Sequence, residues 1–184
     1  MKEGLSTDRT KQFEATVLPH LNAAYNLARW LLKDDQSARD VVQEAYLRAF
    51  RFFDGFRGGD ARPWVLGIVR NACFTYLHDR GCAADILEFD EERDSLEQVT
   101  GFDHRADNNP ERLLEDKYER ARLDRAIEKL PFIFREVLIL REIEELNYEE
   151  ISRVAVIPVG TVMSRLARAR KMLRAMLTSS NEDN

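Results

Sequence analysis

The segment from Asn147 to Leu177 constrains the fold more than any other part of the chain, because it reads as two short helices joined by a tight turn. Asn147 can cap the first helix, and Glu150 can complete a capping box three residues later. Pro158 and Gly160 then interrupt the pattern, so a second helix is expected from about Thr161 onward. Apolar residues at helical spacing form one arc of this second helix: Val162, Leu166, Ala169, Leu173 and Met176. The sequence therefore predicts a helix-turn-helix whose second helix packs one face and presents the other.

The presented arc of the second helix is polar and basic. It consists of Thr161, Ser164, Arg165, Arg168 and Lys171. From residue 153 to residue 178 there are five arginines, one lysine and no acidic residue, in a chain whose net charge is -5. An ordinary solvated face is the alternative interpretation, but such a face usually mixes both signs of charge at i,i+4 spacing. The pattern favours a helix that enters a DNA groove.

Charge divides the 184-residue chain into three zones. Residues 1–84 carry 12 basic and 10 acidic side chains, residues 85–119 carry 4 and 13, and residues 120–184 carry 12 and 10. The middle zone has low hydrophobicity and a Gly and an Asn-Asn-Pro break, which predicts a flexible linker. No segment shows the alternating pattern of a strand. The expected fold is all-α, with two small helical domains at residues 10–84 and 120–178 joined by a flexible acidic linker at 85–119.

The scattered cysteines and histidines argue against several classes of site. Cys73 and Cys82 lack CxxC spacing, and no signal peptide precedes them, which fits a reducing cytoplasm. His20, His78 and His104 lie in unrelated segments, and the sequence has no HExxH motif and no glycine-rich phosphate loop. No apolar run approaches the roughly 20 residues of a membrane span. We therefore expect no catalytic residue, no metal, no cofactor and no membrane insertion.

A second strongly patterned helix is predicted at residues 36–53, with Asp34 or Asp35 as its cap. Its expected core arc is Ala38, Val41, Val42, Ala45, Ala49 and Phe52. The opposite arc places an apolar residue among charges of both signs: Asp40, Gln43, Glu44, Leu47, Arg48 and Arg51. A solvated face with one exposed leucine is possible. A protein partner nevertheless suits this face better than nucleic acid does, because its carboxylates would repel phosphates.

Several motifs resemble, in order and spacing, a bacterial sigma factor of the extracytoplasmic-function (ECF) group. They are DVVQEAYLRAFR, FDGFRG, a W-x-x-x-I-x-R-N segment ending in YL, LPFIFREVLILREIEELNYEEIS and IPVGTVMSRLARAR. The resemblance runs from about Phe13 to Leu177. It implies a protein without enzymatic activity that binds core RNA polymerase and directs promoter-specific transcription initiation. The partners that it implies are the β′ clamp helices and β subunit of the polymerase, promoter DNA and an anti-sigma factor.

The resemblance implies two roles for the first domain. One is to bind core polymerase, and the other is to recognise and melt the −10 element. The residues implied for polymerase binding are Asp40, Gln43, Glu44, Leu47 and Arg48. Those implied for the −10 element are Arg62, Trp64, Arg70 and Asn71. The amide of Asn71 matches the position that meets a flipped base, a task suited to a group with donors and acceptors. Trp64 could instead serve packing.

The resemblance makes the second domain the reader of the −35 element. The residues that it implies are Arg141, Thr161, Met163, Ser164, Arg165, Arg168 and Lys171. Two residues depart from the family pattern. Val156 stands at a turn position where glycine is frequent, so we expect a strained or altered turn. Met163 stands where many members carry an arginine or lysine, and methionine cannot donate a hydrogen bond to guanine. The resemblance therefore does not predict which −35 sequence this chain prefers.

Two other functions remain open at the level of sequence. One is a stand-alone helix-turn-helix regulator, and the other is a sigma-like protein that sequesters an anti-sigma factor without reading DNA. The face around Leu47 and the −10-like segment argue against the first, and the basic second helix argues against the other. The acidic linker predicts a further property, since its charge would repel duplex DNA and suit a basic polymerase channel.

Overall fold

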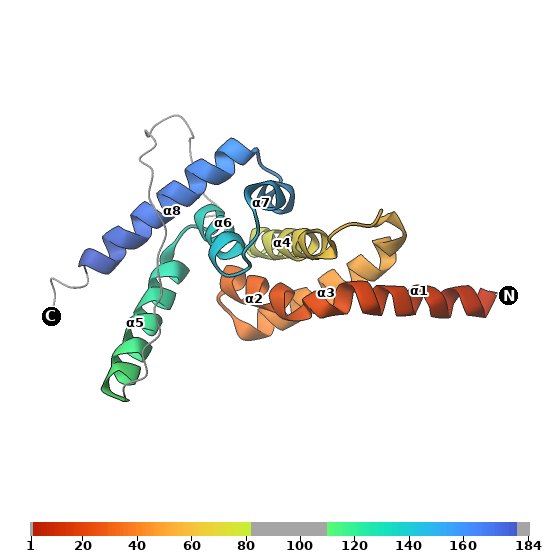
Figure 1. Cartoon of the computed structure of the whole chain (residues 1–184), viewed down its shortest axis with the longest axis horizontal. Helices are drawn as coiled ribbons and strands as arrows, with labels where there is room; N and C mark the ends of the chain where they lie inside the picture. The colour runs from red at the N-terminus through yellow and green to blue at the C-terminus, as the bar shows by residue number, and fades with distance from the viewer. Residues whose placement is uncertain (1, 82–109, 180–184) are drawn as a thin grey trace.

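The computed structural model describes residues 2–81 and 110–179, and its elements in these ranges are helices with no strand (Figure 1). The expectation of an all-α chain is therefore confirmed. The first unit contains α1 (Lys2–Val17), η1 (Leu18–His20), α2 (Leu21–Leu32), α3 (Asp35–Phe52), η2 (Phe53–Gly55) and α4 (Ala61–Asp79). The second unit contains α5 (Pro110–Lys129), α6 (Phe132–Glu142), α7 (Tyr148–Ala155) and α8 (Val159–Ser179).

Helix α3 begins where the sequence predicts, because the Asp34 side chain accepts a hydrogen bond from the backbone N–H of Ser37 at 2.7 Å. Its predicted core arc is buried as far as Ala49. Phe52 is different: it is 68% exposed, so its assignment to the core was wrong. The helix ends at Phe52 and the chain turns into η2, which brings the buried Phe53 to the core instead. There Phe53 meets the ring of Phe13 edge-on at 5.4 Å.

The helix-turn-helix forms as the sequence predicts. The Asn147 side chain accepts from the N–H of Glu150 at 2.9 Å, and the Glu150 carboxylate accepts from the N–H of Asn147 at 2.8 Å, which is a complete capping box. Helix α8 starts at Val159, two residues earlier than expected. Its packed arc is buried at Val162, Leu166, Ala169 and Leu173, while Met176 is half-buried.

The boundary of the predicted linker needs a correction. Helix α5 begins at Pro110, so residues 110–119 are helical and do not belong to a flexible segment. Proline suits the first helical position because its fixed φ matches the helix and its missing N–H would have no helical partner there. The remainder of the predicted linker, 85–109, lies outside the described residues, as does Cys82.

Cys73 is buried, and burial raises the pKa of its thiol to about 12, which fits a packing role.

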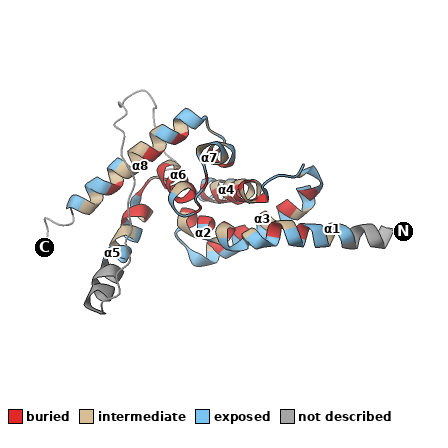
Figure 2. Cartoon of the chain, viewed as in Figure 1, coloured by how far each residue is buried: buried red, intermediate tan, exposed pale blue. Residues whose placement is uncertain are grey.

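The two units pack against each other along α4 with α7 and along α2 with α6 (Figure 1). Buried residues of both units form one continuous cluster at this junction (Figure 2). A Cβ atom built on Gly67 of α4 would lie 3.9 Å from the Cα atom of Val154 in α7, so the helices approach closely where α4 has no side chain. The Arg135 guanidinium, fully buried in α6, donates to the carbonyl of Leu31 at the end of α2 at 3.1 Å.

The turn between α7 and α8 holds Val156 in the left-handed region, at φ 57° and ψ 48°. The side chain is 73% exposed and therefore gains little from packing. A β-branched residue resists this conformation, which costs an L-residue roughly 1–2 kcal/mol. The strain expected from the sequence at this turn is thus present.

Replacing Val156 with glycine should stabilise the protein. Relief of the left-handed strain outweighs the extra freedom of glycine in the unfolded chain, and the net gain expected in the free energy of unfolding is about 0.5–1 kcal/mol. Urea denaturation followed by helical circular dichroism measures this change. Val156→Ala, which keeps a Cβ atom, should gain less than Val156→Gly. A Val156→Gly protein that unfolds at a lower urea concentration than the parent would contradict the strain.

Candidate nucleic-acid interface

The presented arc of α8 is only partly open to solvent. Lys171 and Met163 are exposed, with Met163 at 48%, whereas Thr161, Ser164, Arg165 and Arg168 are half-buried. The Ser164 hydroxyl donates to the carbonyl of Thr161 at 3.0 Å. The expectation of a uniformly outward face was therefore wrong, because the packing of α8 on α6 covers part of this arc.

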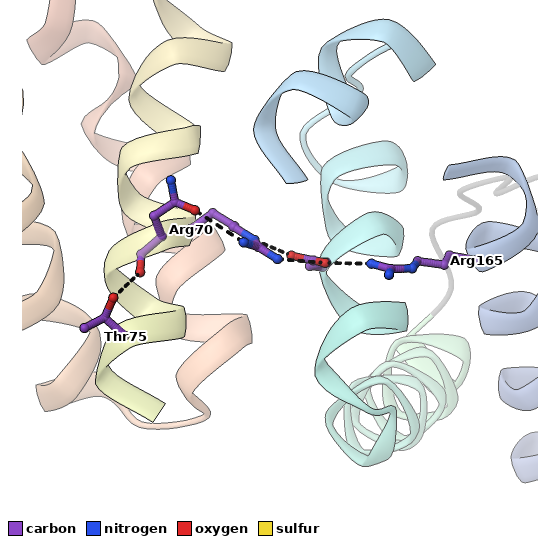
Figure 3. Close-up of polar contacts among 5 residues, drawn as sticks. Arg70, Thr75 and Arg165 are labelled. Carbon is purple, nitrogen blue, oxygen red and sulfur yellow. Dashed lines mark hydrogen bonds and ion pairs between the residues drawn. The ribbon is translucent and has the colours of Figure 1, made fainter. Parts of the chain in front are cut away.

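Arg165 reaches toward α6 rather than into solvent. Its Nη1 lies 3.4 Å from Oε1 of Glu136, a fully buried carboxylate (Figure 3). One turn further along, Arg170 pairs with Glu142 of α6 at 2.6 Å. The sequence pattern could not reveal these partners, since they come from a different helix. Part of the positive charge of α8 is thus matched by glutamates of α6.

Apolar side chains gather at the start of the second helix of the motif. Val156, Val159 and Met163 are exposed at 73%, 38% and 48%. In the major groove, apolar groups can contact the methyl group of thymine, whereas arginine selects guanine. The exposed end of α8 therefore offers apolar contacts in addition to its basic ones.

Arg141 has a role within the motif itself. Its Nη1 donates to the carbonyl of Leu146 at 2.8 Å, and its guanidinium lies 5.3 Å from the ring centre of Tyr148. Leu146 belongs to the connection between α6 and α7, and Tyr148 is the first residue of α7. The Arg141 side chain is half-buried and links this connection to the start of α7.

The −10 candidates lie on α4, and two of them differ clearly in surroundings. Trp64 is half-buried against Phe56, with ring centres 5.1 Å apart, which agrees with its packing interpretation. Asn71 is exposed, and its side-chain oxygen accepts from Arg70 at 3.3 Å. Its backbone carbonyl accepts from the Thr75 hydroxyl at 3.0 Å (Figure 3).

Arg70 crosses from α4 to the second unit. Its Nε lies 2.6 Å from Oε2 of Glu136, and its Nη2 lies 3.3 Å from Oε1, so the guanidinium binds the carboxylate with two nitrogens (Figure 3). The rings of Phe74 and Phe132 lie 5.3 and 5.6 Å from the guanidinium carbon. Burial raises the pKa of the Glu136 carboxyl, and the hydrogen bond and charge of Arg70, with the charge of Arg165, oppose that rise.

Arg62 makes a parallel contact across the same junction. Its Nη2 lies 2.6 Å from Oε2 of Glu144, whose side chain is 4% exposed. Sequence reasoning missed Glu136 and Glu144 as partners of the −10 arginines. These pairs join residues 66 and 82 positions apart, and no local pattern signals contacts of that range.

The face predicted to bind a protein is exposed throughout: Asp40, Gln43, Glu44, Leu47 and Arg48. Leu47 is 55% exposed, and Glu44 and Arg48 form an ion pair at 2.5 Å beside it. Next to this face lies an open apolar groove of about 590 Å³. Its lining includes Leu18, Leu21, Tyr25, Val42, Tyr46 and Leu47. The sequence signal did not include Leu18 and Leu21, because they lie on a different segment that folds beside α3.

Residues 2–81 and 110–179 contain no cluster of three or more His, Cys, Asp or Glu side chains arranged to hold a metal ion. In the same ranges, no helix combines the length and apolar character that a membrane crossing requires.

Family models match both units. The model described as Sigma-70 region 2 matches residues 16–81, and the model described as Sigma-70, region 4 matches residues 120–173. The RNA polymerase sigma-H factor of Pseudomonas aeruginosa is 35% identical over 172 residues, which cover 89% of this chain and 84% of the relative. The ECF RNA polymerase sigma-E factor of Escherichia coli is 38% identical over 136 residues, covering 73% and 70%.

Two solved structures share the fold. The sigma factor RpoE of Bartonella quintana, in complex with the anti-sigma factor NepR, aligns with a TM-score of 0.67 at 24% identity, covering 91% of this chain and 98% of that one. CnrH, in complex with the cytosolic domain of CnrY, aligns with a TM-score of 0.62 at 23% identity, covering 92% and 90%.

The matches to both regions, in the order of the ECF relatives, do not favour a stand-alone helix-turn-helix regulator or a sigma-like sequestering protein. The exposed face of α3, the arginines of α4 and the helix-turn-helix of α7 and α8 lie within the matched residues. The chain belongs to the ECF group of RNA polymerase sigma factors, proteins that direct promoter-specific transcription.

Proposed function

We propose that this sigma factor divides its work among three surfaces. Residues 10–84 bind core RNA polymerase through α3 and recognise and melt the −10 element through α4. Residues 120–178 read the −35 element through α8. The observation that supports this division most is the contrast between two faces, an exposed mixed one around Leu47 of α3 and a partly exposed basic one on α8. The first suits a protein and the second suits DNA.

The polymerase surface is the α3 face together with the adjoining apolar groove. Exposed Leu47 both lines the groove and lies between the charged residues of the face, so a partner helix could bury apolar area there and meet charges of both signs at the rim. Interfaces commonly have this composition, with an apolar centre and a polar edge. The expected partner is the pair of β′ clamp helices, with the β subunit contacting other parts of the chain.

Leu47→Asp should weaken binding to core polymerase by about tenfold or more, because it places a charge where an apolar contact is buried, and central contacts of this kind typically carry about 2 kcal/mol. Association measured by surface plasmon resonance reports the change. Phe52→Asp is the matched control, since Phe52 is also an exposed apolar residue of α3 but lies outside the proposed face. Equal affinities for parent and folded Leu47→Asp would exclude this face as the polymerase contact.

The −10 surface is the outer side of α4, where Arg62 and Arg70 would hold phosphates and Asn71 would meet an extruded base. Asn71 is exposed, and an amide offers both a donor and an acceptor to a base edge. Enzymes that act on bases use the same principle when they extrude a nucleotide and read its edge by hydrogen bonds. Trp64 contributes by supporting this side of α4 through its contact with Phe56.

Asn71→Ala should impair promoter opening more than initial promoter binding, because the amide acts only after a base leaves the stack. The expected loss is about tenfold in the fraction of open complex, the effect of one lost base contact of about 1–3 kcal/mol. Permanganate reactivity of promoter thymines measures opening, and filter binding at low temperature measures initial binding. Asn26→Ala, an exposed asparagine of α2, is the control. Full opening by Asn71→Ala would make Asn71 an ordinary surface residue.

The −35 surface is the exposed part of α8 with the half-buried polar residues beside it. Met163, one of the proposed base readers on this helix, is 48% exposed. Methionine can contact a thymine methyl group but cannot donate to guanine. Arg141, Thr161, Ser164, Arg165, Arg168 and Lys171 would supply the remaining base and phosphate contacts.

Met163→Arg should therefore change the preferred −35 base at one position, with a discrimination of about 1–3 kcal/mol in favour of guanine. Arg168→Ala should instead lower affinity for all sequences and reduce the salt dependence by about one unit, if its contact is to phosphate. Selection of −35 sequences from a promoter library, in transcription with core polymerase, compares the two variants with the parent. Identical preferences for Met163→Arg and the parent would show that this side chain does not read DNA.

Three broader assignments complete the proposal. The chain acts in the cytoplasm with RNA polymerase and contributes binding energy rather than enzymatic chemistry. An anti-sigma factor is its expected regulator, because one solved structure that shares the fold holds the sigma factor RpoE together with the anti-sigma factor NepR. The proposed role of the acidic linker concerns residues 85–109, which lie outside the described part of the chain.

A further inference from the structure

Reading two promoter elements at once places a geometric demand on the chain. The names −10 and −35 put the elements about 25 base pairs apart, which is about 85 Å at about 3.4 Å per base pair. In the structure α4, which carries the −10 candidates, lies directly against α7 of the helix-turn-helix. The distance of 3.9 Å between the built Cβ of Gly67 and the Cα of Val154 shows how close they are. A chain in this arrangement cannot occupy both elements.

The ion pairs that join the two units, within the described residues, follow one charge pattern. Three arginines of the first unit pair with three glutamates of the second: Arg29 with Glu128 at 3.9 Å, Arg62 with Glu144 at 2.6 Å, and Arg70 with Glu136 at 2.6 Å. The last two pairs engage the arginines proposed to hold −10 phosphates. In both pairs a carboxylate of the same chain therefore engages a guanidinium group that could otherwise bind a phosphate.

Burial distinguishes these two pairs from ordinary surface ion pairs. The side chains of Glu136 and Arg70 are 0% and 13% exposed, and Glu144 is 4% exposed although its partner Arg62 is 33% exposed. Charges in such surroundings are screened little by salt. Removing one partner leaves the other charge buried without compensation. As long as the units stay together, Arg62 and Arg70 are therefore committed to Glu144 and Glu136.

Arg165 provides a second positive charge beside Glu136, which matters if the two units separate. Its Nη1 lies 3.4 Å from Glu136 within the second unit, so this carboxylate keeps a cationic neighbour when Arg70 departs. Separation then does not leave Glu136 without a counter-charge. A junction with a satisfactory pairing in both states is suited to switching between them.

We propose that Glu136 and Glu144 act as internal substitutes for DNA phosphate. They hold the two units closed and withhold Arg62 and Arg70 from promoter DNA until the units separate. This inference rests on the proposed function of those arginines at the −10 element. The free full-length chain is accordingly closed, and a chain lacking the two carboxylates is shifted toward the separated form.

The first test measures the shape of the full-length protein by small-angle X-ray scattering. Glu136→Gln combined with Glu144→Gln should increase the radius of gyration relative to the parent. The matched control combines Glu142→Gln with Glu149→Gln, two exposed glutamates of the second unit that do not join it to the first. This control should retain the radius of the parent. A parent that is already extended, or a folded double variant as compact as the control, would overturn the proposal.

The second test asks whether opening releases phosphate-binding charge. The probe is a fluorescent duplex of 30 base pairs with random sequence, and anisotropy is measured over a range of salt concentrations. The Glu136→Gln, Glu144→Gln protein should bind about tenfold more tightly than the charge-matched control. Its logarithmic salt dependence should steepen by about one to two units, as expected for one or two additional phosphate contacts. Binding equal to the control in a protein that has opened would overturn the proposal.

A steric variant tests the same junction independently, so that the proposal remains testable even if the charge variants do not fold. Gly67→Leu adds a side chain where α4 meets α7 and leaves every charge in place. It should also increase the radius of gyration and tighten duplex binding relative to Gly67→Ala, whose Cβ atom makes an ordinary contact at 3.9 Å. Retained compactness of a folded Gly67→Leu protein would count against a junction that closes by this contact.

Transcription with core polymerase separates this inference from the proposed function. The Glu136→Gln, Glu144→Gln protein should transcribe from library promoters as well as the parent, because neither glutamate belongs to the proposed binding surfaces. If the Glu136→Gln, Glu144→Gln protein transcribes normally but the free protein binds the duplex no more tightly than the control, the proposed closed arrangement is overturned and the proposed function is not. A parent that fails to direct transcription would instead contradict the proposed function.

Discussion

The paired carboxylate of Glu136 is the interaction on which the arrangement of this protein depends. A buried ionised carboxyl is costly unless hydrogen bonds and opposite charge compensate it. Here the compensation comes from two directions, from Arg70 of α4 and from Arg165 of α8. Three helices are thereby fixed around one group, and the −10 candidate helix is brought onto the helix-turn-helix unit.

Local signals in the sequence predicted the elements well. The capping box of Asn147 and Glu150 and the buried arc of α3 depend on residues a few positions apart, and both are present in the structure. Errors occurred where an element ends. Phe52 fits the periodicity of α3 but lies on its last turn, where the chain leaves the helix. Pro110 starts α5 inside a stretch whose acidic composition predicted a linker, because a residue that favours a helix start outweighed that composition.

Long-range contacts account for what the sequence could not predict. A helical wheel places Arg165 on a presented face, yet the surface that covers it belongs to another helix of the same chain. Arg62 and Arg70 were expected to be available to DNA, but their partners stand 82 and 66 positions away. The groove beside Leu47 likewise needs Leu18 and Leu21 from a separate segment. Periodicity describes which face a helix presents, and it contains no information about what the rest of the chain places there.

The surfaces that remain open in this arrangement suggest an order of binding. The α3 face and its apolar groove are exposed, whereas Arg62 and Arg70, the arginines proposed for the −10 element, are paired with Glu144 and Glu136. Under the roles proposed for these surfaces, polymerase docks on the closed chain, whereas DNA has to compete with buried carboxylates. Since salt screens exposed phosphate contacts more than buried pairs, free DNA is a weak competitor at physiological ionic strength. A partner that binds α3 and separates the units would remove this competition, so that polymerase binding precedes promoter recognition.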